Sequence, residues 1–315
     1  MSGLAESREQ IVEILRGRVL RGLQAGTLSA GDRLPSTRDL AQEFDVDYRL
    51  VLAAYRELAS EGLIELRTRG GIYVAAQPAG VGGIPPLPER WFAEVLSQGL
   101  LREIPAPELN EWLRRSTETL RLRAVVISST TDQVYGLCRE LRDDFGFESA
   151  GLLATEAQTT PTPLIVRRAD VLVTTAAHAV WVRAMAAEMR KSVIVIEVRP
   201  DLVGGEWALL LRRPVYAIVA TQEFGDMLRG FFADVPGIEN LHVLVFGRDD
   251  VSTIPNDAPT YVTQRVRQQL GNVPIRGRIL PAARTISSAS AKELFSFMVR
   301  ANIEAMSRRD PRAPM

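Results

Sequence analysis

The sequence predicts an α/β protein in two parts, a small helical head followed by a larger domain built on a mostly parallel sheet. Three observations carry this prediction. Helix-spaced apolar residues recur up to residue 60, a stretch rich in glycine, alanine and proline occupies residues 77–90, and from residue 123 apolar runs typical of strands alternate with helical segments. We therefore expect a head at residues 1–76, a linker with connecting helices at 77–122, and an α/β domain at 123–315.

The bulk composition is that of an ordinary globular protein. Of the 315 residues, 46% are hydrophobic and 24% are charged, and 38 basic side chains balance 38 acidic ones. The sequence contains no apolar run that would span a membrane and no signal-peptide core, and its one cysteine, Cys138, excludes an internal disulfide. These features favour a cytoplasmic protein without membrane contact, and the zero net charge argues against indiscriminate nucleic-acid binding.

Two helices are predicted before residue 45. In the first, over residues 6–24, apolar side chains recur every four positions and form one stripe, made of Ile11, Leu15, Val19 and Leu23. Pro35 disfavours helix at the residue before it. Ser36 and Asp39 have the spacing of a capping box. A second, short helix should therefore span residues 37–43.

A third helix is predicted at residues 48–60, with Asp47 as its N-cap. One face is apolar and should be buried: Val51, Ala54, Tyr55 and Leu58. The opposite face should point outward: Arg49, Leu52, Ala53 and Arg56. Two short helices joined by a tight turn, the second with an outward face, indicate a helix-turn-helix. Two short β segments, 63–67 and 71–75, then predict a hairpin, or wing.

These motifs resemble the DNA-binding domain of the GntR family. The resemblance covers residues 7–75 and rests on Gly31-Asp32-Arg33-Leu34-Pro35-Ser36-Thr37-Arg38-Asp39-Leu40-Ala41, Ala54-Tyr55-Arg56-Glu57-Leu58, Glu61-Gly62-Leu63-Ile64 and Arg69-Gly70-Gly71-Ile72-Tyr73-Val74. It implies that the third helix, the recognition helix, enters the major groove of double-stranded DNA while the wing reaches the minor groove. It also implies a homodimer on a near-palindromic operator.

The resemblance assigns candidate DNA contacts position by position. Arg38 matches an arginine early in the family's second helix that contacts phosphate or base, and Arg67 and Arg69 match wing positions. At the start of the recognition helix the family commonly has an arginine and a threonine where this chain has Tyr48 and Leu50. Base contacts then shift onto Arg49, which can pair with guanine, and onto Leu50, which can meet a thymine methyl group. The full predicted set is Arg33, Ser36, Thr37, Arg38, Tyr48, Arg49, Leu50, Arg67, Arg69 and Gly70.

The charge of the head limits how it can bind DNA. Residues 1–76 contain ten arginines against eleven aspartates and glutamates, a net charge of −1. The binding surface must therefore come from a local cluster of arginines rather than from the average charge. For Arg33 and Arg56 an ordinary solvated surface position is an equally good interpretation.

From residue 123 onward strands and helices alternate. We predict strands at 124–129, 150–154, 171–175, 192–198, 215–220, 241–246 and 261–263, and helices at 131–144, 177–190, 223–232, 264–270 and 289–307. Continuous apolar strands followed by helices indicate a parallel sheet covered on both faces. The domain forms either one sheet or two lobes with a break near residues 199–213. The two-lobed layout resembles sensory domains of the periplasmic-binding-protein type.

Polar residues gather where the predicted strands end, and ligands of such sheets bind beyond the carboxyl ends of the strands. Serine and threonine hydroxyls and helix N-termini offer donors to an anion or a polyol. For each of these residues ordinary loop chemistry is the alternative, and His178 fits a helix-start cap or the core as well. The predicted effector contacts are Ser128, Ser129, Thr130, Thr174, Thr175, His178, Glu197, Arg199, Thr221 and Gln222.

Three functions fit these features. The first, which we predict, is a transcription regulator whose α/β domain senses an unknown small metabolite and modulates operator binding. The second is a DNA-binding module whose α/β part only dimerises. The third is an enzyme fused to a DNA-binding domain, with Ser128, His178 or Glu197 as candidate catalysts. Because phosphate-binding glycine motifs, a nucleophile elbow and histidine clusters are missing from the sequence, we predict no enzyme activity, no cofactor and no metal site.

Overall fold

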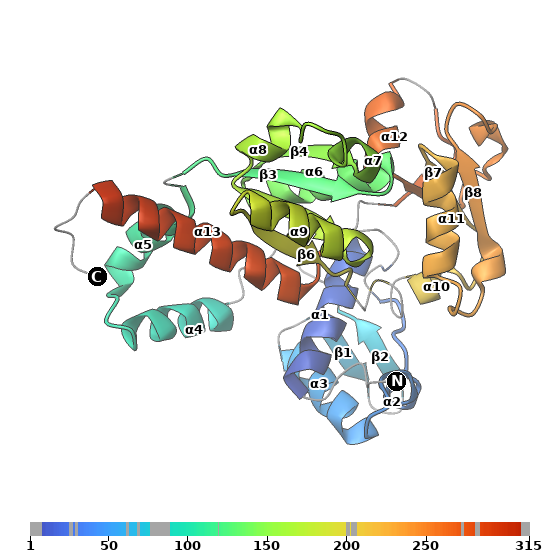
Figure 1. Cartoon of the computed structure of the whole chain (residues 1–315). Coiled ribbons are helices and arrows are strands. Elements are labelled where there is room, and N and C mark those ends of the chain that lie inside the picture. The colour runs from blue at the N-terminus through green and yellow to red at the C-terminus, as the bar shows by residue number, and fades with distance from the viewer. Residues whose placement is uncertain are drawn as a thin grey trace. The chain divides into compact units, whose positions relative to one another are not determined.

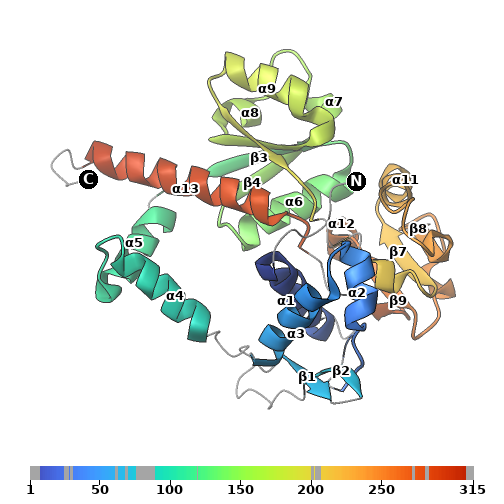
Figure 2. The same cartoon turned by 90° about the horizontal axis from the view of Figure 1, so that it is seen from below.

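The computed structural model divides the chain into two compact units, residues 1–103 and 104–315 (Figures 1 and 2). The boundary lies inside the predicted connecting segment. Among the described helices none is both long and apolar enough to cross a bilayer. The structure describes residues 8–24, 28, 31–60, 63–67, 70–75, 89–118, 120–199, 202, 207–271, 274–280 and 284–309.

The first unit contains a three-helix core closed by a hairpin. Its elements are α1 (Arg8–Gln24), α2 (Thr37–Phe44), α3 (Tyr48–Ser60), β1 (Ile64–Arg67), β2 (Gly71–Val74) and α4 (Glu89–Leu100). The predicted apolar stripe of the first helix lies in this core together with the inner face of α3 and one face of the hairpin. The predicted helix and strand bounds agree with the structure to within two residues where both are described. The predicted linker at 77–90 lies largely outside the described residues.

The second unit contains two separate parallel sheets, so the two-lobed alternative is confirmed. Lobe 1 has the strand order β4-β3-β5-β6, and lobe 2 has the order β10-β9-β7-β8. In each lobe the first strand in chain order has the second strand on one side. The third and then the fourth strand lie on its other side. The strands are β3 (Arg123–Ser128), β4 (Glu148–Leu153), β5 (Val171–Thr175), β6 (Ser192–Ile196), β7 (Val215–Val219), β8 (Leu241–Val245), β9 (Pro259–Val262) and β10 (Arg278–Ile279).

Helices cover both faces of the lobe 1 sheet. The described helices of this unit are α5 (Ala106–Glu118), α6 (Thr131–Asp143), α7 (Ala154–Ala157), α8 (Leu164–Arg168), α9 (Ala179–Glu188), α10 (Ala208–Leu210), α11 (Gln222–Phe231), α12 (Gln264–Gln269) and α13 (Ser288–Arg309). Alternating residues of β3 divide between two cores, with Ala124 and Val126 facing α6 and α13, and Val125 and Ile127 facing α8 and α9. Sequence analysis did not predict α7, α8 or α10, because a single turn of helix is too short to show a hydrophobic period.

Two crossings of the chain join the lobes and pair with each other. The chain leaves lobe 1 after β6 and returns from lobe 2 into α13, and an antiparallel bridge joins Val198 to Ile286. The backbone N–H of Arg199 donates to the carbonyl of Thr285 at 2.9 Å. Glu140 of α6 accepts hydrogen bonds from the N–H groups of Thr285 and Ile286 at 2.8 and 3.1 Å. The crossings therefore form a short two-stranded connection held against lobe 1.

The core of lobe 2 contains a tyrosine whose titration can be tested. The ring of Tyr261 lies edge-on to Trp207 at a centroid distance of 5.5 Å. Burial, with smaller contributions from the negative charges of Asp132 and Glu140, raises the pKa of Tyr261 to about 12 from its ordinary 10.0. Below pH 10 the phenol is protonated in both the folded and the unfolded chain, so the folded state keeps its full stability. As the pH rises above 10 the unfolded phenol ionises first, and this stability is lost until the folded phenol also ionises at about pH 12.

We expect the free energy of unfolding to fall between pH 10 and 12, and Tyr261→Phe to reduce this fall. Denaturant unfolding at a series of pH values, followed by tryptophan fluorescence, measures both. The exposed Tyr48 gives the matched control, Tyr48→Phe. Equal pH profiles for wild type and Tyr261→Phe would contradict the assignment.

Candidate functional sites

The turn between α2 and α3 is held by side-chain and backbone caps. Ser36 and Asp39 form the predicted capping box, with Ser36 N–H donating to Asp39 Oδ2 at 3.1 Å and Asp39 N–H donating to Ser36 Oγ at 3.2 Å. Asp45 ends α2 in the left-handed region at φ 55°. Asp47 Oδ1 accepts from the N–H of Arg49 at 2.7 Å and begins α3. The three-residue turn therefore fixes how α3 leaves α2.

The two faces of α3 differ in burial, and of the four residues predicted to point outward Arg49 and Arg56 are exposed while Leu52 and Ala53 are half-buried. The predicted inner residues are buried, none of them more than 1% exposed: Val51, Ala54, Tyr55 and Leu58. At the start of the helix Tyr48 is 48% and Leu50 is 37% exposed, and Arg49 is exposed between them. The guanidinium of Arg49 lies 5.9 Å from the centroid of the Tyr48 ring. The first turn of α3 therefore presents three side chains of different chemistry to solvent.

The wing is the two-stranded hairpin that the sequence predicts. β1 and β2 pair antiparallel from Ile64↔Val74 to Arg67↔Gly71. The segment at residues 31–34 lies along β2 through an isolated antiparallel bridge between Arg33 and Tyr73, with Leu34 N–H donating to the carbonyl of Ile72 at 2.8 Å. Backbone hydrogen bonds therefore hold this segment, which precedes α2, against the hairpin.

The bridge to Tyr73 brings Arg33 beside the wing. Gly71 has a φ of +111°, and a Cβ at this position would lie 3.2 Å from Arg33 Nε, so the guanidinium passes close to the backbone of the hairpin. Gly70 forms the described end of the turn, where its carbonyl accepts from the hydroxyl of Tyr73 at 2.9 Å. Arg69 lies outside the described residues, and its DNA contact stays a prediction.

Ion pairs divide the arginines of the first unit into two groups. The paired arginines are Arg8 with Glu57, Arg16 with Glu13, Arg18 with Glu43 and Arg67 with Glu65. Within residues 8–74, four others have no carboxylate partner among the described residues: Arg33, Arg38, Arg49 and Arg56. These four come from the segment bridged to β2, the start of α2 and the outer face of α3. Among the described arginines of residues 8–74, positive charge without a carboxylate partner is therefore concentrated on those elements.

The remaining predicted DNA contacts of this region are already engaged with other groups or are partly buried. The hydroxyl of Ser36 is engaged in the capping box, and Thr37 beside it is half-buried. Arg67 is exposed, but it pairs with Glu65 at 3.0 Å and its guanidinium lies 4.2 Å from the centre of the Tyr73 ring. A net-neutral Arg67–Glu65 pair attracts phosphate less than a free arginine does.

Comparison with known proteins assigns this region to a family. Residues 8–74 match the description "Bacterial regulatory proteins, gntR family". The N-terminal head is a GntR domain. The match begins with α1 and ends with β2, so it contains the capped turn, the outward start of α3 and the wing.

Relatives share the GntR domain and little more of the chain. HTH-type transcriptional regulator Rv1152 of Mycobacterium tuberculosis is 44% identical over 61 residues, 19% of this chain and 50% of the relative. The vitamin B6 salvage pathway transcriptional repressor PtsJ of Salmonella typhimurium is 36% identical over 101 residues, 31% of this chain and 23% of the relative. This chain therefore spans half the length of the first relative and about a quarter of the second.

Solved structures with a GntR domain were also found. A GntR family transcriptional regulator from Listeria monocytogenes is 24% identical, covers 34% of this chain and 92% of that chain, and has a TM-score of 0.24. YtrA from Sulfolobus acidocaldarius, a GntR-family transcription factor, is 24% identical with a TM-score of 0.22. Scores this low do not describe the fold of the whole chain.

A second candidate site lies at the carboxyl ends of the lobe 1 strands. Ser129 follows β3, and its Oγ lies 2.8 Å from Nε2 of His178. The indole N–H of Trp181 donates to Nδ1 of His178 at 3.4 Å. The tautomer of the His178 ring sets which of Ser129 Oγ and His178 Nε2 donates. Ser129 itself is exposed.

Two of the predicted effector contacts lie in the core instead. Ser128 is fully buried and donates to Gln133 Oε1 at 2.9 Å, and Thr174 is fully buried and donates to the carbonyl of Ile127 at 2.8 Å. Neither hydroxyl reaches a surface where a ligand would meet it. Both residues lie inside their strands, and the alternation of strand side chains turns them toward the covering helices.

The other predicted contacts divide among three places. Thr130 caps α6. Thr175 is half-buried at the end of β5, the strand that pairs with β3. Glu197 and Arg199 belong to the paired crossings between the lobes. Thr221 caps α11 in lobe 2, where the side chain of Gln222 donates to Asp226 at 2.7 Å.

Sequence analysis missed Asp132, which lies in the first turn of α6 and is only 3% exposed. Its carboxylate accepts hydrogen bonds from lobe 2, including the N–H of Ala220 at 3.0 Å and the hydroxyl of Thr263 at 2.5 Å. An acidic residue in the first turn of a helix is an ordinary solvated group in most proteins. Nothing local in the sequence distinguishes Asp132 from such a residue.

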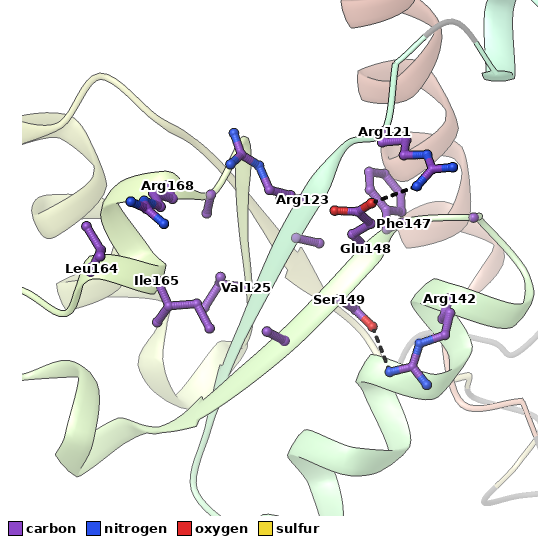
Figure 3. Close-up of a pocket in the computed structure, with 14 residues that line it drawn as sticks. Arg121, Arg123, Val125, Arg142, Phe147, Glu148, Ser149, Leu164, Ile165 and Arg168 are labelled. Atoms are coloured by element: carbon purple, nitrogen blue, oxygen red, sulfur yellow. Dashed lines mark hydrogen bonds and ion pairs between the residues drawn. The ribbon is translucent and has the colours of Figure 1, made fainter.

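A cavity of about 750 Å³ runs along the edge strand β4 toward the amino ends of β3 and β4 (Figure 3). Three of the arginines that line it have partners: Arg121 with Glu148 at 3.8 Å, Arg142 with Ser149 at 3.5 Å and Arg123 with Asp170 at 3.4 Å. Figure 3 shows Arg123 and Arg168 on one side of β4 and Arg142 on the other, so these guanidinium groups do not converge. The cavity lies at the opposite end of the strands from the predicted effector residues.

Proposed function

We propose that this protein is a DNA-binding transcription regulator, with α3 in the major groove and the wing at the minor groove. The observation that carries the proposal is the outward first turn of α3, where Arg49 and Leu50 are exposed while the opposite face anchors the core. The four arginines without a carboxylate partner among the described residues, Arg33, Arg38, Arg49 and Arg56, support it, because a domain with almost no net charge needs such a cluster to attract phosphate. The names of the relatives, which are transcriptional regulators, support it further.

Selection of bound fragments from the native genome tests this proposal. The full chain is incubated with fragmented genomic DNA, and the retained fragments are sequenced. We expect a shared, near-palindromic site whose affinity falls as the salt concentration rises. No enrichment over unselected DNA would reject the proposal.

We propose that the regulator acts as a homodimer through α4. Leu96 and Leu100 are 40% and 68% exposed and lie one helical turn apart on α4. Neighbouring Leu101 is 77% exposed. Exposed leucines at this spacing form an apolar stripe that a second helix can cover.

Leu100→Glu is expected to shift the chain from dimer to monomer, because it places a charge in the proposed helix contact. Sedimentation equilibrium measures the mass. Leu164→Glu is the matched control, since Leu164 is also exposed, at 50%, but lies in the second unit. A dimer of unchanged stability in Leu100→Glu would assign the interface to another surface.

We propose further that the second unit senses a small molecule. Its two lobes, their paired crossings and the exposed hydroxyl of Ser129 support this interpretation. The enzyme alternative loses support from Ser128, one of its candidate catalysts, which is fully buried. A thermal-shift screen with a metabolite library tests the proposal, and we expect at least one compound to raise the melting temperature. No stabilising compound would favour a unit that only dimerises.

A further inference from the structure

Asp132 is a buried carboxylate bound by neutral donors from the other lobe. Its two oxygens accept from the N–H of Ala220 at 3.0 Å, the N–H of Thr221 at 3.2 Å, the hydroxyl of Thr221 at 3.4 Å and the hydroxyl of Thr263 at 2.5 Å. Thr263 is 2% exposed. Among the described residues no arginine, lysine or histidine forms a salt bridge with Asp132. Two backbone N–H groups and two hydroxyls around one negative charge are the donor set of an anion-binding site.

These donors lie where a parallel sheet binds ligands. Ala220 and Thr221 follow β7, and Thr263 follows β9. In the lobe 2 order β10-β9-β7-β8, the connection from β7 leads to one side of the sheet and the connection from β9 leads to the other. The crevice between the carboxyl ends of two such strands is the usual ligand position of an open α/β sheet. Asp132 thus occupies the ligand position of lobe 2.

Asp132 comes from the matching position of lobe 1. It follows β3, which neighbours β5 in an order of the same kind, and it lies three residues after Ser129. Further contacts between α6 and α12 support the arrangement, with Arg139 donating to Gln264 at 2.6 Å and Arg265 donating to the hydroxyl of Tyr135 at 2.7 Å. The carboxylate therefore joins the two candidate ligand positions of the unit.

We propose that the donors of Ala220, Thr221 and Thr263 form an anion site which Asp132 fills from within, and that the effector carries a carboxylate or phosphate group that displaces it. This inference rests on the proposed small-molecule sensing of the second unit. An anion bound to these donors leaves Asp132 without partners beside a like charge. The joined arrangement is then disfavoured relative to one in which the lobes separate, so binding shifts the population between the two. The exposed Ser129, which follows β3 at the same carboxyl end of the lobe 1 strands, would bind a polar part of the same molecule.

Chemical rescue of a vacated site tests the proposal without DNA or effector. In the full chain Asp132→Ala removes the internal carboxylate, and melting temperatures are measured in sodium chloride, sodium acetate and sodium phosphate of equal ionic strength. We expect the variant to melt below wild type in chloride, and acetate or phosphate to recover part of the loss. The same salts should shift wild type much less. The acetate and phosphate arms distinguish the two kinds of anionic group.

The matched control removes a donor from the vacated site. In Asp132→Ala combined with Thr263→Val, the acetate and phosphate effects should fall to the wild-type level. If Asp132→Ala does not fold in chloride, the same comparison uses Asp132→Ser, whose shorter side chain also vacates the site. Equal responses of the folded variant and wild type to all three salts would overturn the proposal, and the contact would be a structural tie only. A failed metabolite screen of the wild-type chain would count against sensing and leave this result intact.

Discussion

Replacing Arg49 by alanine is expected to weaken binding to the selected operator by about 1–3 kcal/mol, roughly five- to 150-fold, without unfolding the domain. Arg49 is exposed in the first turn of α3 and has no carboxylate partner among the described residues. It therefore loses no ion pair when its guanidinium leaves water to hydrogen-bond with the edge of a guanine. Its backbone N–H, which Asp47 caps, is unaffected by the substitution. The loss should therefore appear in binding alone.

Binding isotherms on the selected operator and on copies with single base changes measure this effect. Arg8→Ala is the matched control, because it also removes one positive charge but lies on α1, where Arg8 pairs with Glu57. We expect Arg49→Ala to lose discrimination at one or two base pairs, whereas Arg38→Ala should weaken all sequences alike and lower the salt dependence. Equal affinity for Arg49→Ala and Arg8→Ala would remove Arg49 from the interface.

Tyr55→Ala is expected to destabilise the GntR domain by about 3–5 kcal/mol, the typical cost of deleting a buried aromatic ring. The ring of Tyr55 is 1% exposed in the core of α1, α2 and α3. Its hydroxyl donates to the carbonyl of Pro35 at 2.9 Å and so ties α3 to the segment that begins α2. Loss of the ring leaves a cavity where the two helices of the motif meet.

Hydrogen exchange followed by mass spectrometry measures this change locally in the full chain, because amides of α1, α2 and α3 report on the GntR domain. Tyr55→Phe is the control that keeps the ring and removes one hydrogen bond, at a cost of about 0.5–1.5 kcal/mol. We expect fast exchange throughout α1–α3 in Tyr55→Ala and a small change in Tyr55→Phe. Unchanged protection of α3 in Tyr55→Ala would show that the ring is not part of the domain's stable core.

The limits of sequence reasoning are clearest at the ends of strands. Ser128 and Ser129 are adjacent, and the sequence treats them alike as polar residues after an apolar run. In the structure the hydroxyl of Ser128 donates to the side chain of Gln133 on α6, whereas the hydroxyl of Ser129 contacts the ring of His178. Successive side chains of a strand point to opposite faces, so the strand's last residue decides which hydroxyl is available. A hydrophobic pattern defines that position only to within a residue or two.

The sequence alone determined the GntR domain and its outward recognition helix. Helix periods, the Ser36–Asp39 box and the Asp47 cap act within four residues, and such local preferences are readable without a fold. The tertiary structure decided the bridge between residues 31–34 and β2, the division into two sheets and the setting of Asp132. Residues 31–34 find β2, and Asp132 meets Thr263 131 positions away, only after distant segments have packed. The order of strands, which brings such partners together, leaves no local trace in the residues themselves.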